Sequence, residues 1–271
     1  MKRLRLLAAL AVLFVPSLAL ADAIVAPGAL TSVEGTYSNF YPFGIDAINP
    51  LNQGALDSQR YQQAYDASVF GGLSGPVTIE GIGFRPDAQY GSAFATTLSD
   101  IQINLSTTPL SLDALTGTFA SNVGIDDTIV VNRGALSLTS SFTGPAGGPM
   151  AFDIYIPLDT AFVYDPTAGN LLLDVRNYAG QVDPSIFPVF DADMSDVLWR
   201  GYTTNPDVDG VDNAEATLSG RGFGLVTQFI YTPVETGGDT GPVAVPLPSA
   251  SVLVAIGLAG VARSRRRRRP R

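Results

Sequence analysis

The stretch DIQINLS, residues 100–106, decides the fold class of this chain. Its apolar residues Ile101, Ile103 and Leu105 alternate with two polar amides, which places the two kinds of side chain on opposite faces of an extended strand. The stretch AFDIYIPL, residues 151–158, has the same alternation. A period of two residues is typical of antiparallel strands with one buried face, so both segments predict β structure.

The rest of the central region has the same character. Further strands are expected in PVTIEGIGFRP (76–86), TIVV (128–131), ALSLTSSF (135–142), NLLLDVRN (170–177), SDVLWRGY (195–202) and GFGLVTQFIYTP (222–233). Turn-forming glycine, proline, asparagine and aspartate separate these segments. The stretch DSQRYQQAYDASVF (57–70) is the nearest to an amphipathic helix, and it also fits a strand. The sequence therefore predicts an all-β fold, a single antiparallel β-sandwich or jelly-roll-like domain over residues 22–233.

The first 21 residues have the pattern of a secretory signal peptide. Three basic residues precede an apolar run, and the small residues Ala19 and Ala21 follow it. This order predicts export and cleavage by signal peptidase after Ala21. The alternatives, a buried N-terminal helix or a membrane anchor, require a longer apolar run and no cleavage site.

Charge and composition exclude several function classes. Of the 16 basic residues, three lie in the predicted signal peptide and seven near the C-terminus, which leaves six arginines against 25 acidic residues and a formal charge of −19 for the exported body. Such a body is repelled by nucleic acid and by anionic lipid. The chain has no histidine and no cysteine. This composition excludes histidine-dependent triads, imidazole metal sites, disulfides and thiolate chemistry.

The C-terminal region predicts a membrane-sorting tail. After a small, polar linker at 234–244, the tail spans residues 245–271 and combines a Pro-x-Pro motif, an uncharged run and an arginine cluster. The motif consists of Val245, Pro246, Leu247 and Pro248, and the cluster contains Arg263, Arg265, Arg266, Arg267, Arg268 and Arg269. The uncharged run with its preceding residues is near the length of one short transmembrane helix. The arginines predict that the tail faces the cytoplasm and that the acidic body lies outside.

This combination resembles the PEP-CTERM sorting signal of Gram-negative bacteria, in a Val-Pro-Leu-Pro form where Leu247 replaces the commoner glutamate. The resemblance implies a transient stay in the inner membrane, processing by an exosortase-type protease, and delivery to the cell surface or extracellular matrix. The body also resembles PEP-CTERM proteins without assigned activity, in GIGFRPD, INLSTT, FDIYIPLDTAFVYDPTAGNLLLDVRN and GLVTQFIYTP. The alternative for the tail is an ordinary membrane anchor that is kept uncleaved.

One acidic loop has the spacing of a calcium site. In NPDVDGVDNAE (205–215), Asn205, Asp207 and Asp209 occupy positions 1, 3 and 5 of an EF-hand-like loop, and a glycine follows. The second half departs from that pattern, although Asp212 is available as a further oxygen ligand. The loop is therefore a candidate Ca²⁺ site or, alternatively, a solvated acidic turn.

Paired aspartates are the remaining catalytic option. Glycosidases need two carboxyl groups at a defined separation. Asp191 and Asp193 are expected on one face of a strand, whereas the neighbours Asp126 and Asp127 point to opposite faces. With 25 acidic residues, such a pair arises readily by chance.

The aromatic residues have two interpretations. They form either a stacking surface for sugar rings or part of the core, and the core is favoured in a sandwich without disulfides. The residues concerned are Phe40, Tyr41, Phe43, Tyr61 and Tyr65, with Trp199 expected in the core.

Together these features predict an exported, non-enzymatic protein of the cell surface or extracellular matrix, with a structural or binding role and extracellular polysaccharide as a possible partner. The alternatives are a carbohydrate-active enzyme that uses paired aspartates and a Ca²⁺-stabilised adhesin.

Overall fold

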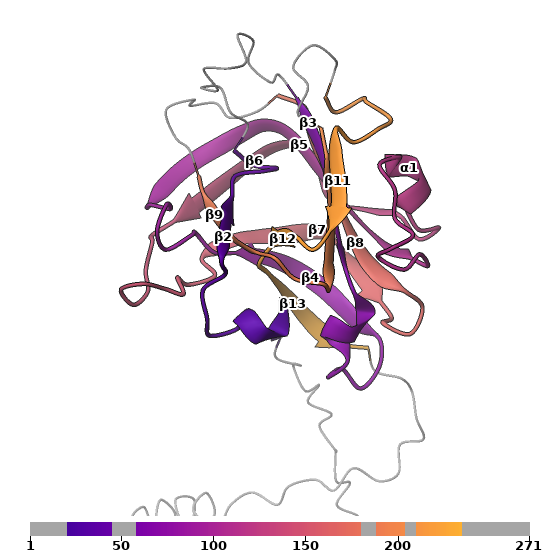
Figure 1. Cartoon of the computed structure of the whole chain (residues 1–271), viewed down its shortest axis with the longest axis horizontal. Coiled ribbons are helices and arrows are strands. Elements are labelled where there is room, and N and C mark those ends of the chain that lie inside the picture. The colour runs from indigo at the N-terminus through magenta and orange to yellow at the C-terminus, as the bar shows by residue number, and fades with distance from the viewer. Residues whose placement is uncertain (1–20, 45–57, 180–187, 204–209, 235–271) are drawn as a thin grey trace, which may run out of the picture. The chain divides into compact units, whose positions relative to one another are not determined.

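The computed structural model describes residues 21–44, 58–179, 188–203 and 210–234. These residues form antiparallel strands with little helix (Figure 1). The strands are β1 (Asp22–Ala26), β2 (Tyr37–Asn39), β3 (Gln59–Tyr65), β4 (Val77–Phe84), β5 (Phe94–Thr108), β6 (Thr128–Ser140), β7 (Ile154–Tyr164), β8 (Asn170–Asn177), β9 (Phe190–Asp193), β10 (Leu198–Tyr202), β11 (Leu218–Arg221), β12 (Gly224–Leu225) and β13 (Thr227–Pro233). The helical segments are α1 (Phe119–Asn122) and the 3₁₀ turns Gly28–Leu30 and Ala67–Phe70.

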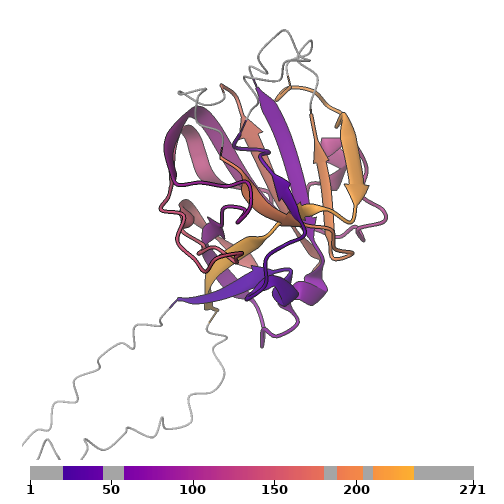
Figure 2. The same ribbon diagram turned by 60° about the vertical axis from the view of Figure 1, so that its left-hand side comes forward.

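The strands make three sheets, which Figures 1 and 2 show from two sides. A four-stranded sheet has the order β1-β13-β4-β7, and a six-stranded sheet has the order β11-β10-β3-β8-β5-β6. A three-stranded sheet has the order β12-β9-β2. This β-sandwich-like arrangement confirms the predicted all-β class.

The main core lies between the four-stranded and six-stranded sheets. Tyr65 of β3 meets Phe229 of β13 edge to face, with ring centroids 5.0 Å apart. Phe70, which follows β3, meets Tyr164 of β7 at 4.9 Å. The alternation that predicted the strands places Ile101, Ile103 and Leu105 of β5 in this same core. Apolar burial on the inward faces therefore holds the two sheets together.

The three-stranded sheet closes one end of the core through Phe190 of β9. The ring of Phe190 lies 5.5 Å from that of Phe43, 6.0 Å from that of Phe84 and 6.5 Å from that of Phe94. Phe43, Tyr61 and Tyr65 are fully buried, which confirms the core interpretation for these three aromatic residues.

The outer face of the six-stranded sheet carries a second, smaller core. Trp199 of β10 is buried there with Ala64, Leu112, Leu115 and Leu172, so its predicted burial is confirmed. The segment between β5 and β6, which includes α1, supplies the two leucines at 112 and 115. The six-stranded sheet is thus covered on both faces in this region.

Most predicted strands are present, with some differences. GFGLVTQFIYTP (222–233) is divided between β12 and β13, which belong to different sheets. NLLLDVRN matches β8 residue for residue, whereas TIVV and ALSLTSSF belong to one continuous strand, β6. DSQRYQQAYDASVF contains β3 followed by a 3₁₀ turn, because Asp66 caps that turn by accepting from the Ser68 amide. The short strands β1, β2, β9 and β11 have too few residues for a visible sequence period.

The chain divides into one compact unit that runs to Val234 and a second unit that begins at Glu235. The predicted linker after Val234, the tail at 245–271 and the signal peptide before Ala21 lie outside the described residues. Among the residues that the structure describes, no helix has the length and apolar character needed to cross a membrane.

The core packing predicts a large effect at Phe229. Its ring is fully buried between Tyr65 and Phe70, so Phe229→Ala should lower the free energy of unfolding by about 3–5 kcal/mol. Chemical denaturation measures this loss. Val163→Ala on the exposed side of β7 is the control and should change stability by less than about 0.5 kcal/mol. A loss at Phe229 as small as that of the control would contradict the described core.

Candidate functional site

The sequence-predicted site residues fall largely outside the described residues. These are the sorting motif Val245–Pro248, the arginines from Arg263 to Arg269, Ala19, and the loop residues Asn205, Asp207 and Asp209. Ala21 is described and lies directly before β1, so the predicted cleavage bond precedes the first strand. Asp212 is exposed and lines a hollow together with Arg60 and Arg176.

A buried ion pair links two strands near one end of the sandwich. Arg85 follows β4 directly, and Asp191 is the second residue of β9. The Asp191 amide donates to the Arg85 carbonyl, so the two backbones run side by side here. The Arg85 Nε and Nη2 atoms lie 2.7 Å and 2.6 Å from Asp191 Oδ2. Both side chains are at most 1% exposed, and the Phe152 ring lies 4.9 Å from the guanidinium.

The same pair holds the segment that leads into β2. Arg85 Nη2 donates to the Val33 carbonyl at 2.6 Å, and the Gly35 amide donates to Asp191 Oδ1 at 3.0 Å. Gly35 approaches so closely that a Cβ at this position would lie 2.2 Å from the Ala192 carbonyl oxygen. Only glycine therefore fits between this segment and β9.

Glu34, Asp87 and Asp191 form an acidic cluster beside Arg85. One carboxylate oxygen from each lies within 4.8 Å of the others. Burial is the main cause that raises the pKa of Asp191 to about 6, against the opposing effect of Arg85. Burial likewise raises the pKa of Glu34. Clustered carboxylate oxygens are the ligand type that Ca²⁺ prefers, and the adjacent arginine supplies part of the compensating charge.

Above this cluster lies a surface hollow of about 410 Å³, here called the tyrosine hollow. Its lining includes Glu34, Thr36, Tyr37, Asp87, Gln89 and Tyr90. Asp87 Oδ1 accepts from the Gln89 and Tyr90 amides at 2.9 Å and 2.6 Å, which shapes this rim. Tyr37 and Tyr90 are 47% and 63% exposed, so both rings face solvent.

An aromatic contact leads from the tyrosine hollow to a second one. Tyr37 meets Phe223 edge to face with centroids 5.7 Å apart, and the Arg200 guanidinium lies 3.7 Å from the centre of the Phe223 ring. The second hollow, here called the arginine hollow, has a volume of about 240 Å³. It is lined by Arg200, Tyr202, Leu218, Ser219, Gly220, Arg221 and Phe223. The two hollows and the Tyr37–Phe223 contact make one strip at the surface.

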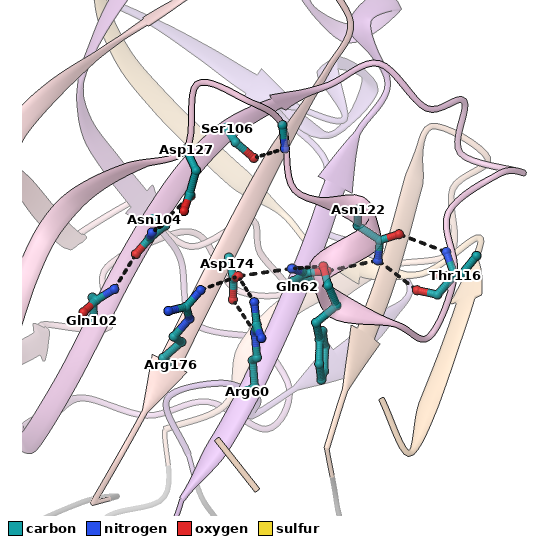
Figure 3. Close-up of polar contacts among 12 residues, drawn as sticks. Arg60, Gln62, Gln102, Asn104, Ser106, Thr116, Asn122, Asp127, Asp174 and Arg176 are labelled. Atoms are coloured by element: carbon teal, nitrogen blue, oxygen red, sulfur yellow. Dashed lines mark hydrogen bonds and ion pairs between the residues drawn. The ribbon is translucent and has the colours of Figure 1, made fainter. Parts of the chain in front are cut away.

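Polar side chains form a row across the outer face of the six-stranded sheet (Figure 3). Arg60 of β3 binds Asp174 of β8 through Nε at 3.1 Å and through Nη2. Arg176 lies 3.4 Å from the same carboxylate, and Gln62 Nε2 donates to it at 3.1 Å. Since one carboxylate, that of Asp174, faces two arginines, these three side chains carry a formal net charge of +1 within the acidic body.

This row also fastens the segment between β5 and β6. Asn122 of α1 donates to Gln62 Oε1 at 3.1 Å and to the Thr116 carbonyl at 2.8 Å, and it accepts from the Thr116 amide (Figure 3). Farther along, Asn104 Nδ2 donates to Asp127 Oδ1 at 3.0 Å. These bonds satisfy most polar groups of this sheet face, with Arg176 Nε as an exception, and they explain how the face accommodates amides and charges.

The predicted aspartate pair has a partly confirmed geometry. Asp191 and Asp193 do face the same segment, because Asp193 Oδ1 accepts from the Thr36 amide at 3.1 Å and from its hydroxyl at 2.7 Å. Each of the two carboxylates is thus engaged by the chain at 35–36. Glu34, Asp87, Tyr37, Tyr90 and Phe223 were not singled out from the sequence. The one local sequence feature that points to this site is Arg85-Pro86-Asp87, where two charged residues follow an apolar strand directly.

No family model, curated protein or solved structure matches this chain.

The buried ion pair predicts a pH-dependent effect of Arg85→Met. Without Arg85, an ionised Asp191 is buried without a counter-ion, and the free energy of unfolding should fall by about 3–5 kcal/mol at neutral pH. The loss should be smaller near pH 5, because a protonated Asp191 needs no counter-ion. Chemical denaturation at both pH values measures the difference.

The sign for the wild type follows from proton linkage. Asp191 has a raised pKa of about 6 in the folded state against 3.8 as its ordinary value, so the folded state holds more protons between these values. The contribution of Asp191 to stability therefore falls as the pH rises through this window. Arg133→Met, which breaks the exposed Arg133–Asp100 pair, is the control and should leave the unfolding midpoint unchanged at both pH values. Equal losses for Arg85→Met at pH 5 and pH 7 would contradict the coupling.

Proposed function

We propose that this chain is an exported, non-enzymatic protein of the cell surface or extracellular matrix that binds extracellular polysaccharide. Export is supported by the predicted signal peptide, and delivery by the sorting-like tail with its Val245–Pro248 motif. In this proposal signal peptidase and an exosortase-type protease are the processing partners. Calcium binding by the loop at 205–212 stays a prediction.

The observation that carries the binding proposal is the aromatic strip. Tyr37, Tyr90 and Phe223 lie along two adjoining hollows at the surface, with hydroxyl and amide groups beside them in the tyrosine hollow. Aromatic faces stack on the apolar faces of sugar rings, and polar neighbours bind their hydroxyl groups. Exposed aromatic rings otherwise cost solvation free energy, so their grouping at hollows is typical of a binding surface.

The exposed tyrosines also distinguish this strip from the core. From the sequence, Phe43, Tyr61 and Tyr65 were candidates for the core or, less favoured, for a sugar-stacking surface, and the structure places all three in the core. The proposed surface consists of other aromatic residues, which lie on β2 (Tyr37), in the segment between β4 and β5 (Tyr90) and directly before β12 (Phe223).

Polysaccharide binding is tested with the double variant Tyr37→Ala/Tyr90→Ala. Affinity electrophoresis of the full chain in gels that contain alginate, xanthan or dextran measures retardation by each polymer. Loss of two stacking faces should weaken binding about tenfold. Tyr155→Ala, which removes a 49% exposed ring on the four-stranded sheet, is the matched control and should bind as wild type. An equal loss in the control, or no retardation of the wild type by any of the polymers, would refute the proposed binding.

Export and sorting are tested by the intact mass of the protein recovered from cell envelopes and from the medium. The expected product lacks residues 1–21 and the residues near and beyond Pro248. A product that keeps the arginine cluster would instead be a membrane-anchored surface protein, and the sorting part of the proposal would be wrong.

A further inference from the structure

Within the strip, we infer that the arginine hollow binds the carboxylate of a uronic-acid residue, so that the polysaccharide is an acidic one. This inference rests on the proposed polysaccharide binding and names its chemical class. It is carried by the state of Arg200, by the charge of the lining and by the shape of the hollow.

Arg200 differs from the other arginines of the exported body, all of which the structure describes. Five of the six form ion pairs with a carboxylate, namely Arg60, Arg85, Arg133, Arg176 and Arg221. Across the described residues, Arg200 has no carboxylate within ion-pair distance, and its contacts are with the Phe223 and Tyr202 rings at 3.7 Å and 4.8 Å. In a body with 25 acidic residues, it is unusual for an arginine to have no carboxylate partner among the described residues.

The neighbours of Arg200 do not satisfy its donors. Gln63 lies beside it on β3, but its Oε1 accepts from the Leu225 amide and the Tyr61 hydroxyl, and its Nε2 donates to the Leu225 carbonyl. On the other side, β11 places Gly220 opposite Arg200, and a glycine has no side chain to offer. The guanidinium is held by aromatic rings and keeps its hydrogen-bond donors for a ligand.

The lining of the arginine hollow favours an anion. Among the described residues that line it are Arg200 and Arg221, the latter paired with Asp113, and no acidic residue, whereas the described lining of the tyrosine hollow has Glu34 and Asp87 and no basic residue. A carboxylate fits this end because the planar guanidinium binds it through two parallel hydrogen bonds. The charge of the two hollows therefore directs the acidic group of a ligand toward Arg200.

The shape of the arginine hollow favours a ring that bears this carboxylate. Phe223, Tyr202 and the exposed Leu218 give it apolar walls, and open space lies over Gly220. A volume of about 240 Å³ corresponds to about eight water molecules at roughly 30 Å³ each, which is room for one sugar ring. A uronic-acid residue combines the stacking face and the carboxylate that these walls and Arg200 require.

The net charge of the body sets the conditions of a test. A formal charge of −19 repels a polyanion at long range, and this repulsion is screened beyond about 8 Å at about 0.15 M salt. The contact with Arg200 is short and partly buried, so it is screened less. Binding should therefore be measured at this ionic strength with short oligomers.

The test compares a short oligogalacturonate with its methyl ester, which has the same rings and no charge. Calorimetry on the full chain should show that the acid binds roughly ten- to hundredfold more tightly, the range expected for hydrogen bonds to a charged group. Arg200→Gln should remove this preference, and Arg200→Lys should restore part of it. If the wild type shows no preference, or if Arg200→Gln keeps it, the inference is overturned.

A second variant tests the hollow without touching its charge. Gly220→Val fills the open space and should therefore weaken the binding of both ligands. The strand itself accommodates valine, because nothing lies within 4 Å of the added Cβ. Gly134→Val is the matched control, since Gly134 is also an open glycine on an edge strand of the same sheet, and it should bind as wild type. Equal binding by Gly220→Val and Gly134→Val would overturn the assignment of the ligand to this hollow.

The failure of this inference is distinguishable from that of the proposed function. If acid and ester bind equally, and Tyr37→Ala/Tyr90→Ala weakens both, polysaccharide binding stands and the preference for a carboxylate is refuted. If neither ligand binds the wild type and no polymer retards it, the inference and the proposed function fail together.

Discussion

The buried pair of Arg85 and Asp191 is the interaction on which the arrangement of the sheets depends. It joins the end of β4 to β9, and through the Val33 carbonyl and the Gly35 amide it also fixes the chain that enters β2. The three-stranded sheet is thereby attached to the four-stranded sheet by a polar contact beside the packing of Phe190 on Phe84. Since desolvation of two charges is costly, such a pair contributes geometry more than stability, and here that geometry places Tyr37 at the surface.

The six arginines of the body illustrate how an acidic protein distributes a scarce cation. Arg85 neutralises a buried aspartate, and Arg60 with Arg176 neutralises another on the outer face of the six-stranded sheet (Figure 3). In both places the arginine makes it possible to bury a carboxylate together with strand amides. Arg200 is supported instead by aromatic rings, which stabilise a cation without neutralising it.

The proposed function suits a domain that has to fold and persist outside the cell without disulfides. Its stability comes from aromatic and aliphatic packing between two large sheets and from a second core around Trp199. The binding strip lies at the rim where β2, β10, β11 and β12 meet, and it shares Tyr202 with this packing. The exposed rings of Tyr37 and Tyr90 lie outside the core, so their part in binding is largely independent of folding.

The sequence by itself determined the fold class and the inward residues of the long strands, because hydrophobic alternation is a local property of an extended chain. It correctly identified Ile101, Ile103 and Trp199 as buried. Only the tertiary structure decided the candidate site. Glu34, Asp87 and Asp191 are far apart in the chain and meet because of strand order and register, which no local pattern encodes. That Arg200 has no carboxylate partner among the described residues is likewise a property of its neighbours in space, so it becomes visible only when β3, β11 and Phe223 are placed around it.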